Sequence, residues 1–248
     1  MISIVMCSVD DARFAAAAAN YSSLLAGEPH EIVRISDAKS MCEGYNRGLR
    51  QARGEVIIFS HDDVEFLAPD FRTRLLDRIS QYDILGSCGS NRLVGPQWIS
   101  AGPPHIFGQT AIVNAKDNCF DVLIWGAPTR VVPAMKVMDG VVLAMKRNVL
   151  EKISFDETTF EGFHLYDLDF TFRAFQAEFS LAVVNDWGLV HASAGTWDQK
   201  WQADAERFTA KHQANFETLP ARRWSAALVK VASKADAMTV MTPHYWTD

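Results

Sequence analysis

The segment Gly54-Glu-Val-Ile-Ile-Phe-Ser-His-Asp-Asp-Val-Glu-Phe66 predicts both the fold class and the position of a site. Its unbroken apolar run, Val56 to Phe59, is typical of a strand in a sheet that is covered on both faces. His61, Asp62 and Asp63 follow directly, and in open α/β sheets ligands bind beyond the carboxyl ends of the strands. One interpretation is a divalent cation held by these residues and bridging to a substrate phosphate. The alternative is an ordinary loop start, since Asp side chains accept hydrogen bonds from turn backbone.

The flanking sequence alternates strand and helix patterns. Strands separated by helices of about 10 to 15 residues indicate a parallel sheet, so we expect an α/β domain. The expected strands are Ile2–Cys7, Ile32–Ile35, Val56–Phe59 and Ile84–Cys88, and the expected helices are one capped by Asp10 and Asp11, one from Ser40 to Arg53 closed by Gly54, and one from Pro69 to Ile79.

The middle of the chain, residues 91–126, is rich in Gly-Pro pairs and lacks a sustained period, so we expect loops and short strands there. Strand character resumes at Val131–Val137 and again before Met145, and a short helix is expected over Lys146–Ile153. Further strands are expected at Leu181–Val184 and Gly188–Val190, followed by a helix over Trp197–Phe216. We expect one domain over residues 1–218 and a helical C-terminal tail over 219–248.

An amphipathic helix is predicted between residues 165 and 179, where Leu and Phe recur at steps of three and four. At about 100° per residue, Asp167 and Asp169 fall on opposite flanks of the apolar stripe. Asp169 lies four residues before Arg173, a spacing that allows an ion pair. Asp167 has no such partner within the helix and is therefore the freer of the two for chemistry.

Composition narrows the class of protein. The chain has 248 residues, 48% of them apolar, as in an ordinary globular domain, and its net charge of −6 argues against a nucleic-acid partner. Four cysteines without a CxxC pair exclude the common zinc-finger spacings and favour reduced thiols. We expect a cytoplasmic protein without signal peptide or transmembrane segment, for which peripheral contact with a membrane stays open. The absence of GxxxxGK[ST] excludes a Walker-type NTPase, and the glycine-free loop Cys7–Asp11 argues against a nucleotidyltransferase.

Several motifs, taken in order, resemble those of the GT-A glycosyltransferases of family 2. His61-Asp-Asp63 looks like their metal-binding Asp-x-Asp element, and the preceding helix and strand look like its usual context. Asp139-Gly140 resembles the acceptor-side strand, and Tyr166-Asp-Leu-Asp-Phe-Thr-Phe-Arg173 is similar to the Glu-Asp base motif with its trailing Asp and Arg. His191 matches a late metal-ligand histidine. The resemblance covers roughly residues 2 to 195.

The resemblance implies a GT-A fold, with a Rossmann-like, mostly parallel central sheet flanked by helices. It also implies a metal-dependent, inverting transferase, with Mn or Mg as cofactor, that moves a sugar from a nucleotide-diphosphate donor, UDP-sugars being favoured, to a hydroxyl of a glycan or other acceptor in polysaccharide or glycoconjugate biosynthesis. The implied metal ligands are Asp63, His191 and His61, and the implied general base is Asp167. The implied nucleotide contacts are Cys7, Ser8, Val9, Asp37, Asn46, Arg47 and Asp62.

Two departures from the family pattern keep a second class of function open. The first acid of Asp-x-Asp is His61, and the glutamate of the Glu-Asp pair is Tyr166. A non-catalytic module on the same fold, which binds a nucleotide sugar or a glycan, is the alternative that these changes allow.

Overall fold

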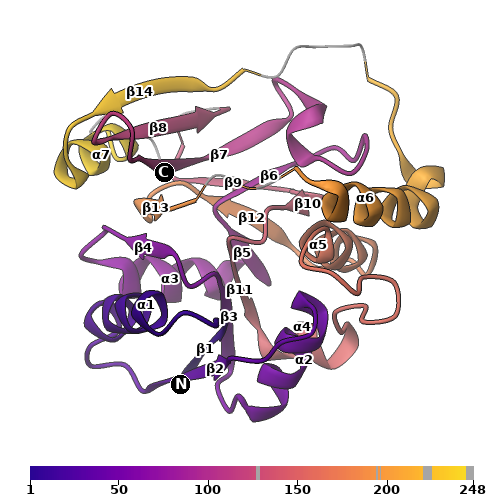
Figure 1. Cartoon of the computed structure of the whole chain (residues 1–248), viewed down its shortest axis with the longest axis horizontal. Coiled ribbons are helices and arrows are strands. Elements are labelled where there is room, and N and C mark those ends of the chain that lie inside the picture. Colours follow the sequence, from indigo (N-terminus) through magenta and orange to yellow (C-terminus); the bar gives the residue numbers. More distant parts are fainter. Residues whose placement is uncertain (127–128, 194, 196, 220–224, 244–248) are drawn as a thin grey trace.

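Two β-sheets, here called sheet A and sheet B, organise the chain (Figure 1). The computed structural model describes residues 1–248 except 127–128, 194, 196, 220–224 and 244–248. Sheet A has the strand order β2-β1-β3-β11-β5-β12-β9. Its strands are β1 (Ile2–Cys7), β2 (His30–Ile35), β3 (Val56–Ser60), β5 (Ile84–Gly86), β9 (Val131–Pro133), β11 (Val142–Lys146) and β12 (Leu181–Val184).

Most strands of sheet A point the same way, which confirms the expected Rossmann-like α/β class. β1 pairs in parallel with β2 and β3, and β12 pairs in parallel with β5. Only β11 and β9 among the strands described in this sheet run against the others. The carboxyl ends of β2, β1 and β3 therefore meet at one edge of the sheet.

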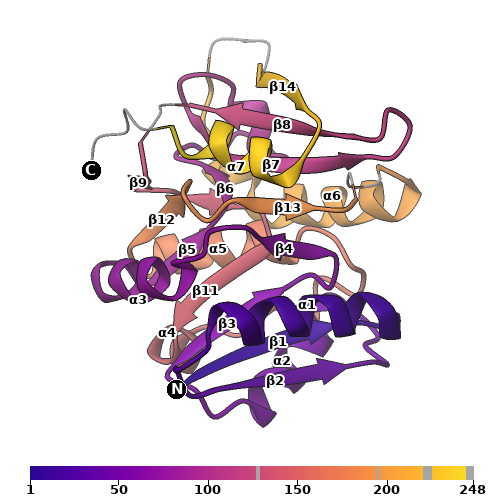
Figure 2. The same cartoon turned by 90° about the vertical axis from the view of Figure 1, so that its left-hand side faces the viewer.

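Helices cover both faces of sheet A, and the alternation along β1 shows why (Figure 2). Ile2, Ile4 and Met6 lie in an apolar cluster with residues of α1 (Asp11–Leu24) and α3 (Phe71–Gln81). Val5, which points to the other face, packs in a second cluster with residues of α2 (Met41–Gln51), α4 (Arg147–Lys152) and α5 (Tyr166–Gln176). Successive side chains of a strand alternate between faces, so one apolar run supplies two cores.

Helix α2 approaches β1 closely because two of its residues are glycines. A Cβ at Gly44 would lie 2.4 Å from Cys7 Sγ, and one at Gly48 would lie 2.3 Å from Val5 Cγ1. Gly54, expected to close this helix, does not do so: the C-cap is Ala52. Gly54 instead packs on β1, where a Cβ would lie 2.6 Å from the Ser3 backbone nitrogen. Close packing, and not helix termination, requires glycine there.

Sheet B corrects the expectation of short strands and loops over residues 91–126. Its β7 (Ile106–Asn114) and β8 (Cys119–Trp125) form a long antiparallel hairpin, preceded by the short 3₁₀ helix η1 (Trp98–Ala101). The sequence of β7 does not read as a buried strand, because two polar residues, Gln109 and Thr110, are buried among its apolar ones. The Gln109 amide bonds to the Asn185 and Met241 carbonyls, which offsets the cost of its burial. The other strands of sheet B are β4 (Val64–Phe66), β6 (Cys88–Ser90), β10 (Val137–Met138), β13 (Leu189–His191) and β14 (Ala227–Val231).

Two segments expected to be single strands are divided between the sheets. Ile84–Cys88 splits after Gly86 into β5 of sheet A and the start of β6 of sheet B. Val131–Val137 likewise splits into β9 and the start of β10. In each case the two parts of the segment pair with different strands, one part in sheet A and the other in sheet B.

The C-terminal segment is only partly helical, contrary to expectation. After α6 (Gln199–His212) and η2 (Gln213–Asn215), β14 pairs residue for residue with β8, and α7 (Lys234–Met241) follows. Ala237 and Met241 of α7 are buried in a cluster with Ala111 of β7 and Val122 of β8. Pairing with the open edge of β8 turns residues 227–231 into a strand. The division after residue 218 stays a prediction, and 220–224 and 244–248 lie outside the described residues.

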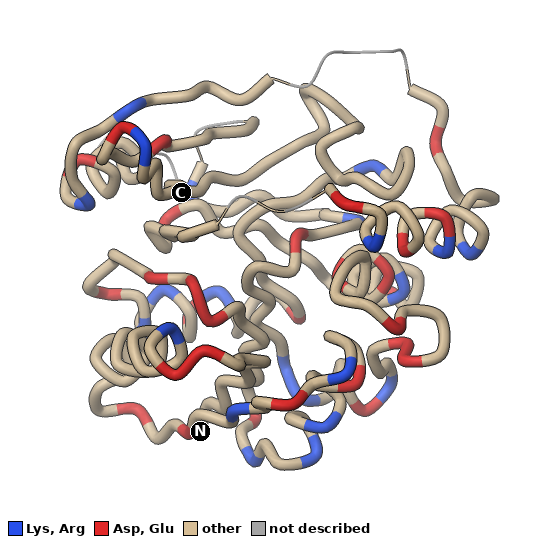
Figure 3. Tube along the Cα trace, viewed as in Figure 1, with Lys and Arg blue, Asp and Glu red and all other residues tan. Residues whose placement is uncertain are grey.

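Acidic and basic residues are interspersed around both sheets (Figure 3). Within the described part of the chain, no helix is both long enough and apolar enough to cross a membrane.

Candidate active site

The residues after β3 meet the end of β13 through strand pairing. β13 runs antiparallel to β4, with His191 opposite Val64, and the Ala192 backbone N–H donates to the Asp63 carbonyl over 2.9 Å. This pairing places the His191 ring beside the Asp63 carboxylate, with Nε2 3.2 Å from Oδ1. The His61 ring lies nearby, with Nδ1 3.9 Å from the same oxygen and its centroid 5.7 Å from that of His191. The three implied metal ligands therefore come together from two distant parts of the sequence.

These three side chains fit a metal ion by the spacing and chemistry of their donor atoms. One ligand atom from each of His61, Asp63 and His191 lies within 4.8 Å of the others. Burial alone would raise the pKa of Asp63, but the hydrogen bond and charge of His191 and the Ser193 hydroxyl hold that pKa well below its ordinary range. Burial, and then the neighbouring His191, lower the pKa of His61, which keeps its imidazole neutral. A charged carboxylate beside a neutral imidazole is the protonation state that metal binding requires.

A second group of side chains surrounds the turn before β11. The Gly140 backbone N–H donates to Asp167 Oδ2 over 2.7 Å, and the Tyr166 hydroxyl donates to the Gly140 carbonyl over 3.1 Å. The Val141 carbonyl accepts from the His61 backbone N–H over 3.1 Å. The turn therefore connects the start of α5 with the segment that carries the candidate metal ligands.

Gly140 has no room for a side chain. A Cβ there would lie 2.4 Å from the Tyr166 hydroxyl oxygen and 2.6 Å from Asp167 Cβ. Glycine is thus what allows the first turn of α5 to lie against this backbone.

Asp167 has the pKa of a general base. Burial, and then the charge of Asp139, raise its pKa from 3.8 to about 7. Asp139 is held in place by the Trp98 indole, whose Nε1–H donates to Oδ2 over 3.0 Å, and by the Val141 N–H, which donates to Oδ1 over 3.0 Å. A base works best when its pKa lies near the operating pH, so this pair of carboxylates suits proton abstraction near neutrality.

One cavity of about 500 Å³ joins the two groups. His61 and His191 lie on its wall together with Asp139 and Asp167. Five aromatic side chains also line the cavity, and two of these are well exposed, Phe163 at 47% and Trp197 at 63%. The aromatic lining residues are Trp98, Phe163, Tyr166, Trp197 and Trp201.

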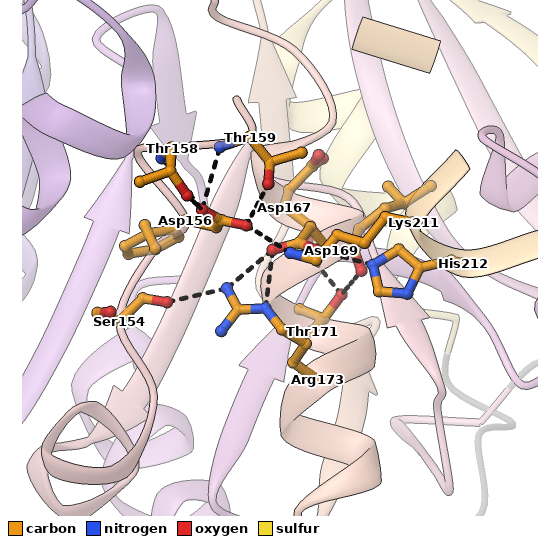
Figure 4. Close-up of polar contacts among 12 residues, drawn as sticks. Ser154, Asp156, Thr158, Thr159, Asp167, Asp169, Thr171, Arg173, Lys211 and His212 are labelled. Carbon is orange, nitrogen blue, oxygen red and sulfur yellow. Dashed lines mark hydrogen bonds and ion pairs between the residues drawn. The ribbon is translucent and has the colours of Figure 1, made fainter. Parts of the chain in front are cut away.

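The position of α5 is held by buried charges behind the cavity (Figure 4). The fully buried Asp169 carboxylate contacts Arg173 at 2.8 Å, and its other oxygen contacts His212 at 2.8 Å and Lys211 at 2.6 Å. Lys211 also reaches Asp156, 2.6 Å away, in the loop before α5. The expected Asp169–Arg173 pair is therefore confirmed, as part of a network that ties α5 to α6. Asp167, on the opposite flank of the helix, faces the cavity.

The implied nucleotide contacts lie near the carboxyl edge of β1, β2 and β3. Ser8 is buried, with its hydroxyl on the Asp10 carbonyl, while Val9 is 84% exposed. Cys7 ends β1; burial, and then the charge of Glu43, raise its pKa to about 12, so the thiol stays protonated. Asp62 lies in the turn after β3, and its side chain makes no hydrogen bond or ion pair with the residues that the structure describes.

Two of the implied nucleotide contacts on α2 have partners inside the protein. The Asn46 amide donates to the Phe155 carbonyl at 2.9 Å and to Glu157 at 2.6 Å, and its oxygen accepts from the Phe155 N–H. Arg47 pairs with Asp37 at 2.8 Å and with Glu43 at 2.9 Å. Asn46 therefore anchors the loop before α5, and Arg47 orients Asp37 at the end of β2.

The predicted site residues do not include Asp139 or Trp98, which also line the cavity. Asp139 was noted only as part of a strand motif, and its signal was an acid placed before glycine and an apolar run. Trp98 lines the cavity, whereas Trp125 and Trp187 are buried.

Comparisons with known proteins bear on the fold and the family of the chain. A search of the curated proteins found no match. Among solved structures, the mannosyltransferase PcManGT from Pyrobaculum calidifontis, in complex with GDP-Man and Mn²⁺, superposes with a TM-score of 0.52 and 11% identity over 88% of this chain. The match covers 66% of that protein's chain, just under two thirds of its length. The structure of A197 from STIV matches with a TM-score of 0.43 and 12% identity, over 79% of this chain and 96% of that one.

At 11% identity the mannosyltransferase structure shows a shared fold alone, the GT-A fold of nucleotide-sugar transferases. The family model described as "Glycosyltransferase like family" matches residues 3–215, which is most of the sequence. The chain belongs to this glycosyltransferase-like family.

Proposed function

We propose that this protein is a metal-dependent, inverting glycosyltransferase that moves a sugar from a nucleotide-diphosphate donor to a hydroxyl of a saccharide acceptor. One observation carries the proposal: a cavity with Asp167, whose pKa is about 7, on one wall and the two histidines of the His61-Asp63-His191 set of donor atoms on another. Group transfer from a diphosphate needs both functions, a proton acceptor for the nucleophile and a positive charge for the leaving group.

His61, Asp63 and His191 would hold the cation. When bound, it would stabilise the negative charge that develops on the diphosphate leaving group. Two imidazoles with one carboxylate favour Mn²⁺ over Mg²⁺, since Mg²⁺ prefers oxygen ligands. Asp62, next to these ligands, would reach the ribose or the metal.

Asp167 would take the proton of the acceptor hydroxyl. Its Oδ2 already accepts the Gly140 N–H, which leaves Oδ1 for the incoming hydroxyl. As the acceptor oxygen forms its bond to the anomeric carbon, the proton passes to Asp167 and the bond to the diphosphate oxygen breaks. A single displacement of this kind inverts the anomeric configuration.

The donor nucleotide would lie along the carboxyl edge of β1, β2 and β3. Cys7, Ser8 and Val9 follow β1, and Asp37, oriented by Arg47, follows β2. Asn46 would support this surface through α2. We propose UDP-sugars as the first donors to test, together with GDP-mannose, the ligand of the structurally similar mannosyltransferase.

The aromatic walls favour a carbohydrate as acceptor. The exposed rings of Trp197 and Phe163 offer flat apolar surfaces, and the Asp139 and Asp167 carboxylates offer hydrogen-bond acceptors in the same cavity. Sugar rings present both C–H faces and hydroxyls, so they match aromatic faces and polar groups at once.

A donor screen tests the proposal. We expect the melting temperature to rise with one nucleotide sugar only when Mn²⁺ is present, and the Asp63→Asn variant to lose this rise. Transfer would then be followed by mass spectrometry with oligosaccharide acceptors, and the anomeric configuration of the product by NMR. Retention of configuration would contradict the role of Asp167. Donor binding without transfer to any saccharide would favour the alternative, a non-catalytic binding module.

A further inference from the structure

The two residues that depart from the family pattern touch each other. His61 Nε2 lies 3.0 Å from the Tyr166 hydroxyl oxygen, although the two residues are far apart in the sequence. The tyrosine ring is 4% exposed and packs edge-on against Tyr45, with ring centroids 5.6 Å apart. The hydroxyl is therefore held at one place on the His61 ring.

The direction of this hydrogen bond follows from the number of protons available. A tyrosine hydroxyl has one proton, and that of Tyr166 is donated to the Gly140 carbonyl, which can only accept. The contact with His61 then requires the ring nitrogen to donate, so the proton of the neutral imidazole is on Nε2. Nδ1 is left with its lone pair, on the side of the ring that faces Asp63, 3.9 Å away.

We propose that Tyr166 is a positioning residue that holds His61 as the Nε2–H tautomer and so makes Nδ1 a metal ligand. This inference rests on the metal site of the proposed function. It accounts for both departures together: an imidazole replaces the first acid of Asp-x-Asp, and a phenol replaces the neighbouring glutamate because an imidazole ligand, unlike a carboxylate, needs a partner that selects its tautomer.

The backbone of Gly140 connects the Tyr166–His61 pair with the candidate base. The Gly140 carbonyl accepts from the Tyr166 hydroxyl, and the Gly140 N–H donates to Asp167. One glycine thus orients both the tyrosine that supports a metal ligand and the candidate base.

The Tyr166→Phe variant tests the proposal, because it removes the hydroxyl and keeps the packed ring. Two measurements apply. Long-range ¹H–¹⁵N NMR on the metal-free protein should show the Nε2–H form of His61 in the wild type and a mixture of tautomers in the variant. Titration with Mn²⁺ alone, followed by calorimetry, should show the affinity of the variant reduced about 10- to 100-fold.

Two further variants distinguish the loss of His61 positioning from a general loss of stability. Tyr82→Phe removes the same group just before β5, at the edge of sheet A opposite the site, and should leave Mn²⁺ affinity unchanged. His61→Asp supplies a ligand that has no tautomers, so adding Tyr166→Phe to it should cost much less affinity than adding it to the wild type.

Three results would overturn the proposal: an Nδ1–H form of His61 in the wild type, unchanged Mn²⁺ affinity in Tyr166→Phe, or equal losses in the wild-type and His61→Asp backgrounds. The expected Mn²⁺ pattern without sugar transfer to any acceptor would support the role of Tyr166 and contradict the transferase function. The two conclusions are therefore tested separately.

Discussion

Replacing Asp167 by Asn should stabilise the fold and slow transfer by about 10²- to 10⁴-fold. Asn keeps an oxygen that can accept the Gly140 N–H, but it carries no charge and cannot act as a base. The pKa of Asp167 is about 7, against an ordinary value of 3.8. A difference of about three pKa units corresponds to about 4 kcal/mol, which is the upper limit of what the folded protein loses by holding this carboxylate charged.

The sign and pH range of this stabilisation follow from proton linkage. The folded protein holds the proton of Asp167 more tightly than the unfolded chain, so the penalty is absent below about pH 4 and complete above about pH 7. Because the side chain is partly open to the cavity, we take about half of the upper limit, about 2 kcal/mol, as the expected gain at pH 8. For a chain of this size that is roughly 4–8 °C in melting temperature.

The assay is chemical and thermal unfolding of both proteins at pH 4.5 and pH 8, together with transfer at saturating donor. We expect the stability gain to appear at pH 8 and to shrink at pH 4.5, and the rate to fall about 10²- to 10⁴-fold. Asp169→Asn is the matched control: it breaks a buried ion network on the same helix and should destabilise by about 3–5 kcal/mol. A gain that does not depend on pH would refute the electrostatic reasoning, and an unchanged rate would remove Asp167 as the base.

Three further predictions concern the same cavity. Gly140→Ala should destabilise the fold by about 1–3 kcal/mol and weaken both transfer and Mn²⁺ binding, because its Cβ would lie 2.4 Å from the Tyr166 hydroxyl oxygen; normal Mn²⁺ affinity by calorimetry would contradict this. The value of kcat for the wild type should rise with pH through about 7 as Asp167 loses its proton, and a pH profile that is flat from 5.5 to 8.5 would count against it. Trp197→Ala should raise the acceptor KM about tenfold without changing the melting temperature, since the ring is 63% exposed; an equal loss of donor affinity would argue against an acceptor contact.

Local chemistry made the core of the fold predictable. The run Val56 to Phe59 forms β3 because an apolar strand can be buried on both faces, and the neighbouring helices follow from periodicity and capping, as with Ser40 before α2. The positions of Asp167 and Asp169 on opposite flanks of α5 also follow from helix geometry alone. One faces the cavity and the other the buried network.

Sequence patterns did not predict the strands that depend on residues far away in the sequence. β7 and β8 were not expected because β7 buries polar groups whose hydrogen bonds come from residues 185 and 241. β14 was expected to be helical, and it becomes a strand because β8 offers it an unpaired edge.

By itself, the sequence determined the first strands and helices of sheet A, the helix α5 and the acids that follow β3, because these depend on contacts between near neighbours in the chain. Only the tertiary structure decided which of those side chains act together. The pairing of β4 with β13 brings His191 to Asp63, and the approach of α5 to the Gly140 turn brings Tyr166 to His61 and Asp167 to Asp139. The physical reason is range: hydrogen bonds and perturbed pKa values act over a few ångströms, and only folding brings residues so distant in sequence within that range.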